Sequence, residues 1–215
     1  MNGLGRTAVV LLAGCSIAFS TGLRAGTGRI DITPSGPIWL SGYGDRTHPS
    51  TGVLTKLWAK ALAIDDGKGG RVVIITTDLI GLPRAITDTV SARIAKEFGL
   101  ERSQILFNSA HTHTGPVVRS NLVTMFDLSP EELERIREYG DRLREALYVV
   151  AGAALGDLSP AEISYGSGET GFAMNRRQFT DKGVRIGVNP QGPVDHSVPV
   201  LRVMSKGKLK AVLFA

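Results

Sequence analysis

Two histidines one residue apart, His111 and His113, are the strongest candidates for chemistry in this chain of 215 residues. They follow an apolar run, 104–108, that predicts a buried strand, and they precede Gly115 and Pro116, which would end it. In an extended chain residues i and i+2 point to the same side, about 6.5 Å apart, so both rings are expected to face one pocket. Neutral imidazole is the commonest metal ligand, and such a pair can hold zinc with further ligands from elsewhere. The alternative, two polar residues at a strand end, stays open.

Other candidate residues carry weaker signals. Arg176 and Arg177 follow a glycine-rich segment, and because guanidinium groups bind carboxylates in a forked geometry, they are a candidate anion contact as well as plain surface residues. Asp78, after an apolar run, is either a hydrogen-bond partner of a metal-binding histidine or, as we favour, a cap of the next turn. The two remaining histidines are expected to be surface or structural residues: His48 and His196.

The first half of the chain predicts a sheet with a crossover helix. Residues 54–64 and 71–77 are expected to form two strands joined by a glycine-rich turn, and the unbroken apolar run 72–75 predicts burial on both faces. A helix is expected to begin at Pro83 and to end at Gly99, with apolar residues at steps of four. The helix returns the chain to the histidine strand, which should then lie parallel to the strand of residues 71–77.

A second helix and further strands complete the predicted fold. Ser129, Pro130 and Glu132 form a capping box with proline in the first turn, and an apolar stripe continues to Val150, with a bend expected near Gly140. Short strands are expected over 29–34, 162–165, 198–203 and 209–215, with glycine-rich segments at 40–46 and 166–171. The fold class is therefore α/β, with mixed β-sheets and crossover helices. Because the last strand is as apolar as the core strands, we expect the natural protein to continue and the fold to be incomplete at the C-terminus.

The N-terminus resembles an export signal. A basic residue, Arg6, precedes an apolar run and then small residues ending at Ala25, so residues 1–25 are predicted to be a signal peptide and the protein to be exported, periplasmic or secreted. Cys15, the only cysteine, lies in a segment similar to a lipobox, so a lipoprotein is the competing prediction. No transmembrane segment is expected in the mature chain, because the apolar run is short for a bilayer.

The charge pattern excludes nucleic acid as a partner. The formal net charge of +5 at pH 7 is small, and basic residues are interleaved with acidic ones along the chain. A nucleic-acid interface would require basic residues clustered on one face or interleaved with aromatic residues.

Several separated segments together resemble the neutral or alkaline non-lysosomal ceramidases and their bacterial relatives. The resemblance extends over nearly all of the chain after residue 25, and the most specific segment is His-Thr-His-Thr-Gly-Pro at 111–116. The other matching segments are 31–34, 41–46, 77–79, 175–176 and 194–196 with the strand that follows.

The resemblance implies a zinc-dependent amidase that cleaves ceramide or a related N-acyl lipid into a fatty acid and a sphingoid base. Residues 26–215 would be the N-terminal portion of its catalytic domain, with the substrate taken from a membrane or micelle surface. His111 matches a zinc ligand, His113 a catalytic pocket residue, and Arg176 a residue important for activity, with Asn175 beside it as a substrate contact. The remaining zinc ligands, a histidine, a glutamate and a tyrosine, would lie beyond Ala215.

Two other functions stay open at this point. In a metallohydrolase of the amidohydrolase type both histidines would bind the metal, and a barrel with regular strand-helix alternation would be expected. In a non-catalytic exported relative, the same fold would bind a lipid or glycan.

We predict that the 215-residue chain alone binds zinc weakly and has little or no amidase activity. One zinc-binding histidine falls short of the three protein ligands that a catalytic zinc site usually has. The measurement is fatty acid released from a labelled N-acyl sphingosine, and chelator-sensitive turnover by this chain alone would contradict the prediction.

Overall fold

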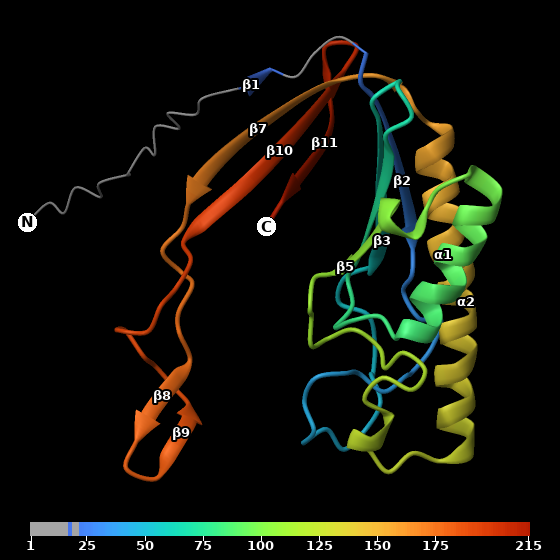
Figure 1. Ribbon diagram of the computed structural model, residues 1–215. Helices are drawn as coiled ribbons and strands as arrows, with labels where there is room; N and C mark the ends of the chain where they lie inside the picture. Colours follow the sequence, from blue (N-terminus) through green and yellow to red (C-terminus); the bar gives the residue numbers. More distant parts are fainter. Residues whose placement is uncertain (1–16, 19–21) are drawn as a thin grey trace, which may run out of the picture. The chain divides into compact units, whose positions relative to one another are not determined.

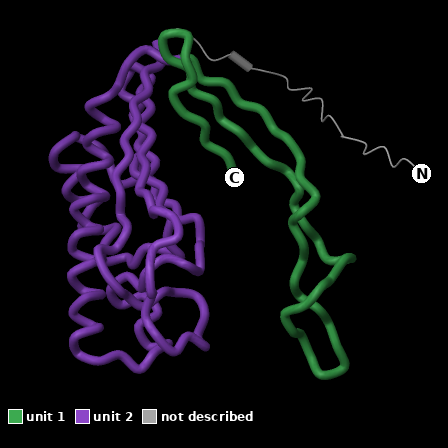
Figure 2. Tube along the Cα trace, turned by 180° about the vertical axis from the view of Figure 1, so that it is seen from behind, with its two compact units in different colours: residues 1–20, 162–215 green, residues 21–161 purple. Residues whose placement is uncertain are grey.

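The computed structural model describes residues 17–18 and 22–215 and divides the chain into two compact units. Residues 21–161 form one of them, the α/β unit, and residues 1–20 with 162–215 form the other, the β unit (Figure 2). The two candidate histidines belong to the α/β unit. Asn175 and Arg176 belong to the β unit.

A five-stranded sheet in the order β5-β4-β3-β2-β6 is the base of the α/β unit. β2, β3 and β4 pair antiparallel, whereas β4 and β5 are parallel, with Thr77 opposite Ser109. The predicted hairpin and the parallel histidine strand are thus confirmed, and so is the mixed α/β class. The strand bounds are β2 (Arg24–Asp31), β3 (Trp58–Asp65), β4 (Arg71–Thr77), β5 (Ile105–Ser109) and β6 (Ser159–Pro160).

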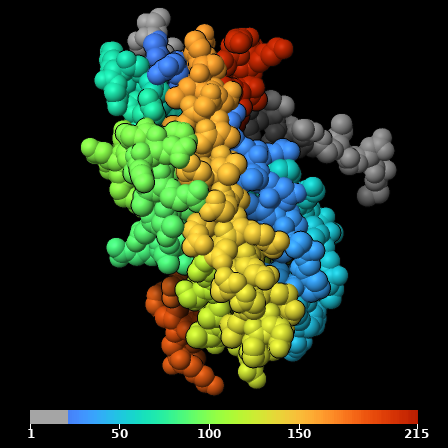
Figure 3. All heavy atoms as spheres, turned by 90° about the vertical axis from the view of Figure 1, so that its right-hand side faces the viewer, coloured from blue at the N-terminus to red at the C-terminus, as the bar shows by residue number. Residues whose placement is uncertain are grey.

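Two α-helices lie on the same side of this sheet (Figure 1). α1 (Arg84–Phe98) connects β4 to β5, follows Pro83, and ends at Gly99, whose positive φ of 66° closes the helix. α2 (Pro130–Gly156) begins at the predicted capping box, in which the Ser129 hydroxyl accepts from the Glu132 amide and the Glu132 carboxylate accepts from the Ser129 amide. In the space-filling view α2 is a continuous band with α1 beside it (Figure 3). Short 3₁₀ turns occur at η1 (Arg102–Gln104) and η2 (Val123–Met125).

The core lies between the sheet and the two helices. Val73 and Ile75 of β4 are fully buried, whereas Val72 is 40 % exposed and Leu106 of β5 is 56 % exposed. The prediction of strands buried on both faces is therefore wrong, because the helices of this unit cover one face only and β5 is an edge strand. On the helices the buried positions follow the predicted stripes, although Leu133 is exposed: Ile86, Val90, Ile94, Ile136, Leu143, Leu147 and Val150.

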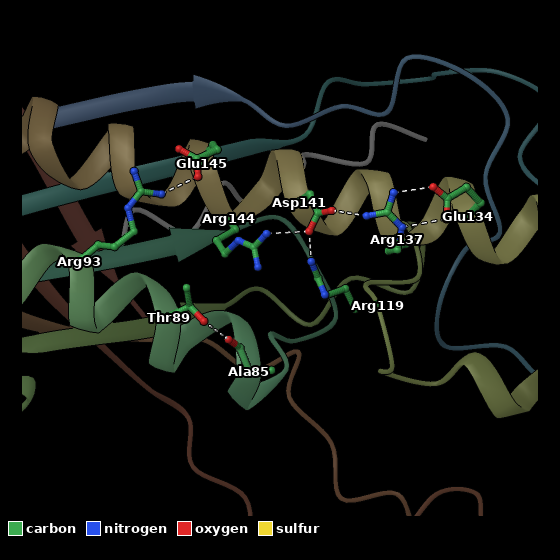
Figure 4. Close-up of polar contacts among 9 residues, drawn as sticks. All are labelled: Ala85, Thr89, Arg93, Arg119, Glu134, Arg137, Asp141, Arg144 and Glu145. Atoms are coloured by element: carbon green, nitrogen blue, oxygen red, sulfur yellow. Dashed lines mark hydrogen bonds and ion pairs between the residues drawn. The ribbon is translucent and has the colours of Figure 1, made fainter.

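A cluster of charged residues on α2 ties the helices to the loop after the histidine segment (Figure 4). Arg93 of α1 pairs with Glu145, and Asp141 accepts from Arg119, Arg137 and Arg144. Around Gly140, where a bend is predicted, α2 runs unbroken from Pro130 to Gly156. A Cβ at Gly140 would lie 2.3 Å from Cγ of Arg119, so this glycine makes room for the arginine.

The β unit contains a sheet in the order β1-β7-β10-β11 and a separate hairpin of β8 and β9. Within the glycine-rich segment 166–171, residues 166–169 are strand and pair with β10. The hairpin was not among the predicted elements. The bounds are β1 (Ile17–Ala18), β7 (Glu162–Glu169), β8 (Arg177–Thr180), β9 (Gly183–Ile186), β10 (Ser197–Ser205) and β11 (Lys208–Phe214).

Residue 25, the predicted end of the signal peptide, lies inside a strand. Ala25 is fully buried and pairs with Ile64 of β3 and Ser159 of β6, and Arg24 forms an ion pair with Asp65. The folded part of the chain therefore includes residues assigned to the signal. Cys15 and most of the predicted signal lie outside the described residues. Within the part of the chain that the structure describes, no helix has the length and apolar character needed to cross a membrane.

Asp65 is the buried carboxylate that joins β2, β3 and β4. It accepts from the Gly67 amide at 2.6 Å, from Arg71 at 3.0 Å and from Arg24 at 3.1 Å. Burial by itself would raise the pKa of Asp65, but these three donors outweigh burial and lower the pKa below its ordinary value of 3.8. The ionised carboxylate thus stabilises the fold above pH 3.8, and this contribution is lost as pH falls through the lowered pKa.

We predict that Asp65→Asn lowers the free energy of unfolding by about 1–2 kcal/mol at pH 7, since both ion pairs lose their charge. The difference from the wild type should shrink as pH falls below 3.8, because the wild-type carboxyl then becomes neutral as well. Urea unfolding at pH 7 and pH 3 measures it, with the exposed Glu138→Gln as the matched control. A difference that stays constant with pH would contradict this role of Asp65.

Candidate functional site

His111 is positioned by the chain segment that follows β4. Beyond the end of β5 the parallel pairing continues, because Ala110 donates its amide to Thr77 and His111 donates its amide to Leu79, both at 2.9 Å. The ring nitrogen Nδ1 of His111 lies 2.8 Å from the carbonyl of Ile80. Since a carbonyl only accepts, Nδ1 carries the proton, and in the neutral ring Nε2 keeps its lone pair free.

The two imidazoles lie side by side, but not for the predicted reason. Their ring centroids are 5.1 Å apart with an interplanar angle of 67°. The strand ends at Ser109, and His111 has a left-handed φ of 59°, so an extended alternation does not bring the rings together. Instead the chain turns, and the turn is held by the hydroxyls of Thr112 and Thr114, which lie 2.9 Å apart.

The glycine-rich segment 41–46 packs directly against His113. Gly42 has a φ of +104°, and a Cβ there would lie 2.4 Å from Cγ of His113. The ring of Tyr43 contacts His113 edge to face at 5.0 Å, and Arg46 donates from Nη2 to the His113 carbonyl at 2.7 Å. The guanidinium of Arg46 also lies 5.3 Å from the centre of the Tyr43 ring. Hence one loop fixes both the ring and the backbone of His113.

Backbone bonds join this loop to the end of the histidine segment. Ser41 donates its amide to Gly115, and Val117 donates its amide to Trp39, at 2.9 and 2.8 Å. The Ser41 hydroxyl donates to the carbonyl of Pro116. Both segments stand out in the sequence, but the contacts of Gly42, Tyr43 and Arg46 with His113 could not be predicted from it. The glycines of segment 41–46 indicated that its backbone approaches another group closely, and that group is the imidazole of His113.

Asp78 takes neither of its two predicted roles. Its carboxylate accepts from the Trp58 amide at 2.9 Å, and its own amide donates to the Trp58 carbonyl. It therefore extends the β3–β4 pairing by one residue. The predictions of a cap and of a histidine partner are both wrong, because the neighbouring strand supplies an unpaired amide at that point.

Asn175 and Arg176 adopt defined positions within the β unit. Asn175 donates to the carbonyl of Pro193 at 3.0 Å and accepts from the Arg177 amide. Arg176 is exposed and donates from Nε to the carbonyl of Gly187 at 2.9 Å. Their role toward the histidine pair, which lies in the other unit, stays a prediction.

The remaining histidines each hold a nearby carbonyl. Nδ1 of His48 lies 2.7 Å from the carbonyl of Pro49, and Nδ1 of His196 lies 3.0 Å from that of Thr170. Both side chains belong to exposed residues. These contacts agree with the structural and surface roles expected for them.

The donor chemistry of His111 fits one position of a metal site. Nδ1 is held by a carbonyl, which orients the ring and leaves Nε2 as the ligand atom, the arrangement usual for metal-binding histidines. Within residues 17–18 and 22–215 there is no group of three or more His, Cys, Asp or Glu side chains that could hold a metal ion. The histidine pair is therefore an incomplete donor set.

Comparisons with known proteins agree on one family. The family model for the N-terminal part of neutral/alkaline non-lysosomal ceramidases matches residues 23–180. A neutral ceramidase of Pseudomonas aeruginosa is 27 % identical over 179 residues, which are 78 % of this chain and 26 % of that protein. A neutral ceramidase of Drosophila pseudoobscura is 30 % identical over 115 residues, 51 % of this chain and 16 % of that protein.

The fold is also similar to that of a solved structure. The crystal structure of the neutral ceramidase from Pseudomonas aeruginosa superposes with a TM-score of 0.70 at 21 % identity, covering 91 % of this chain and 32 % of that one. This chain thus spans about a quarter to a third of the length of the Pseudomonas protein.

We predict that Gly42→Ala displaces His113 and lowers the free energy of unfolding by about 2–3 kcal/mol, because the methyl group would clash with the ring at a left-handed φ. Urea unfolding and the NMR signals of the histidine ring nitrogens measure the two effects. Gly44→Ala is the matched control, since a Cβ there meets only the flexible end of Met125, at 3.3 Å. Equal stability of the two variants would show that Gly42 is not needed for this contact.

Proposed function

The chain belongs to the neutral/alkaline non-lysosomal ceramidase family, and we propose that it contributes the histidine pair of a zinc-dependent hydrolase. The proposed reaction is hydrolysis of the amide bond of ceramide or a related N-acyl lipid to a fatty acid and a sphingoid base. The observation that carries the proposal is the paired imidazoles, 5.1 Å apart, with His111 oriented by the Ile80 carbonyl.

In the proposed site His111 is the zinc ligand, through Nε2. When bound, zinc would lower the pKa of a coordinated water to about 7 and polarise the amide carbonyl. The carbonyl of Ile80 keeps the His111 ring in the tautomer that leaves Nε2 unprotonated. The remaining protein ligands would come from residues outside those described.

His113 is proposed as the group that moves a proton during cleavage. Its ring lies beside that of His111, and Arg46 holds its backbone by donating to the His113 carbonyl. An imidazole has an ordinary pKa near neutrality, so it can accept a proton from the attacking water and give it to the leaving amine. Tyr43 and Gly42 hold the ring in place for this role.

Arg176 is proposed to bind the developing oxyanion or the carboxylate of the released fatty acid. Its Nε is engaged by the Gly187 carbonyl, which fixes the side chain while the residue remains exposed. A guanidinium stays charged at all physiological pH values and can bind a carboxylate with two parallel hydrogen bonds. Asn175 supports this segment through the Pro193 carbonyl and is proposed as a neighbouring substrate contact.

The proposed substrate defines the setting in which the protein would act. Long-chain N-acyl lipids occur in membranes or micelles, so we propose that the protein meets its substrate at such a surface after export to the periplasm or the exterior. Zinc is the proposed cofactor.

We predict that His111→Ala in the full-length protein loses both bound zinc and hydrolysis of N-acyl sphingosine, whereas His113→Ala keeps zinc and loses activity by about a hundredfold or more. Zinc content by elemental analysis and fatty acid release measure the two effects. His48→Ala is the matched control and should keep both, because its ring contacts only the neighbouring Pro49 carbonyl among its described hydrogen bonds.

Loss of zinc in both His111→Ala and His113→Ala would favour the amidohydrolase-type alternative, in which both rings bind the metal. Full-length protein that holds zinc but hydrolyses no N-acyl lipid would contradict the proposed reaction. The described fold does not favour a barrel, since its sheet contains antiparallel strands and is covered by helices on one side.

A further inference from the structure

A groove beside the histidine segment has no role in the site described so far. It has a volume of about 470 Å³ and is formed by the segments 33–40 and 50–57. Thr114 and Pro116 also line it, so the groove borders the segment that carries His113. This volume lies within the range of about 300–1,000 Å³ that is usual for small-molecule sites.

The wall formed by residues 33–40 is fixed to the helix layer. The buried hydroxyl of Tyr139 donates to the Ile32 carbonyl at 2.9 Å, and the Trp39 indole donates to Glu132 at 2.7 Å. Ser50 bridges to the opposite wall, because its amide donates to the Ile38 carbonyl and its hydroxyl accepts from the Ile38 amide. The groove is therefore preformed, which reduces the entropy lost when a ligand binds.

Several polar side chains along the groove are occupied within the protein. The Thr33 hydroxyl accepts from the Leu57 amide, the Ser35 hydroxyl accepts from Arg142, and the Thr114 hydroxyl contacts that of Thr112. Prolines supply no N–H donor, and three of them line the groove: Pro34, Pro37 and Pro116. A polypeptide segment seated here would bring amides and carbonyls that need partners, whereas a hydrocarbon chain would not.

The rim of the groove is apolar and exposed. Leu54 is 99 % exposed and Val53 is 60 % exposed, and both line the groove. The predicted strand over 54–64 begins only at Trp58, so these residues lie in a loop and not in the sheet. An apolar rim around a preformed groove favours an apolar ligand, because binding removes the apolar surfaces of the rim and of the ligand from water.

We infer that this groove binds the unbranched alkyl chain of the lipid substrate, with the polar end of the lipid at the histidine pair. The inference rests on the proposed function, since it assigns a chain-binding site to the same substrate. Thr114, which lines the groove, is the residue after His113, so the groove borders the turn that carries the histidine pair. The alkyl chain can be the acyl chain or the sphingoid base, and the test separates these two sources.

The test uses two photoreactive N-acyl sphingosines with the full-length protein, one with a diazirine in the acyl chain and the other with the diazirine in the base. After illumination, mass spectrometry of the digested protein locates the labelled peptides. We expect one probe to label residues 33–57 in preference to the other. Label from the acyl probe assigns the groove to the acyl chain, and label from the base probe assigns it to the sphingoid base.

Gly36→Phe is the variant that fills the groove. Gly36 lines the groove and a Cβ there meets nothing within 4 Å, so a phenylalanine adds a ring to the lining without a backbone clash. We expect labelling of residues 33–57 to fall about tenfold, because the introduced ring displaces a few methylene groups of the lipid chain from their apolar contacts in the groove. Gly156→Phe is the matched control, since Gly156 also has open space around its Cβ but lies at the end of α2, outside the groove lining.

Leu54→Ser gives a second variant that leaves folding intact, because the side chain is almost fully exposed; it should lower labelling several-fold. Labelling elsewhere, or labelling of 33–57 that is unchanged in Gly36→Phe, would overturn the inference, as would a polypeptide segment that occupies the groove and prevents labelling. Hydrolysis is measured on the same samples. Hydrolysis without label in the groove refutes the groove alone, whereas label without hydrolysis supports the groove and refutes the proposed reaction.

Discussion

The site depends on the parallel pairing of β4 and β5 and on its continuation beyond both strands. The carbonyls of Thr77, Leu79 and Ile80 bind, in order, the Ala110 amide, the His111 amide and the His111 ring. The direction of the Ile80 carbonyl is fixed by the backbone that follows β4. The His111 imidazole that is bonded to it is therefore held in one orientation. Because β4 is also paired with β3 and its residues Val73 and Ile75 belong to the core, the carbonyls that hold His111 have fixed positions.

Around this fixed point the rest of the site is made of loops. The segment 38–46 binds the backbone on either side of His113. α2 holds this segment through the bond from Trp39 to Glu132, and it holds the loop after the histidine segment through the ion pair of Arg119 with Asp141. Each of these hydrogen bonds contributes only about 1 kcal/mol, but they act on the same short stretch of chain. The helix layer thus both completes the core and limits the movement of the loops that surround the histidines.

In the proposed function, two kinds of surface would share the recognition of the substrate. The histidine turn offers ring nitrogens and exposed polar groups, whereas the adjoining groove offers proline rings, aliphatic side chains and hydroxyls that are already bonded. Such a contrast suits an amphiphile, whose head requires directed hydrogen bonds and whose tail requires only removal from water. Family membership and this contrast both support the proposed class of substrate.

The sequence alone determined the features that depend on near neighbours in the chain. Both helices and their ends follow from Pro83, Gly99 and the Ser129 capping box, and the β3–β4 hairpin and the parallel β5 follow from apolar runs and connection lengths. Only the tertiary structure decided which strand faces are buried, how the histidine turn is shaped, and that Gly42 contacts His113. These properties depend on groups about 70 residues apart and on which side of the sheet the helices cover, and neither local periodicity nor residue type encodes such distances.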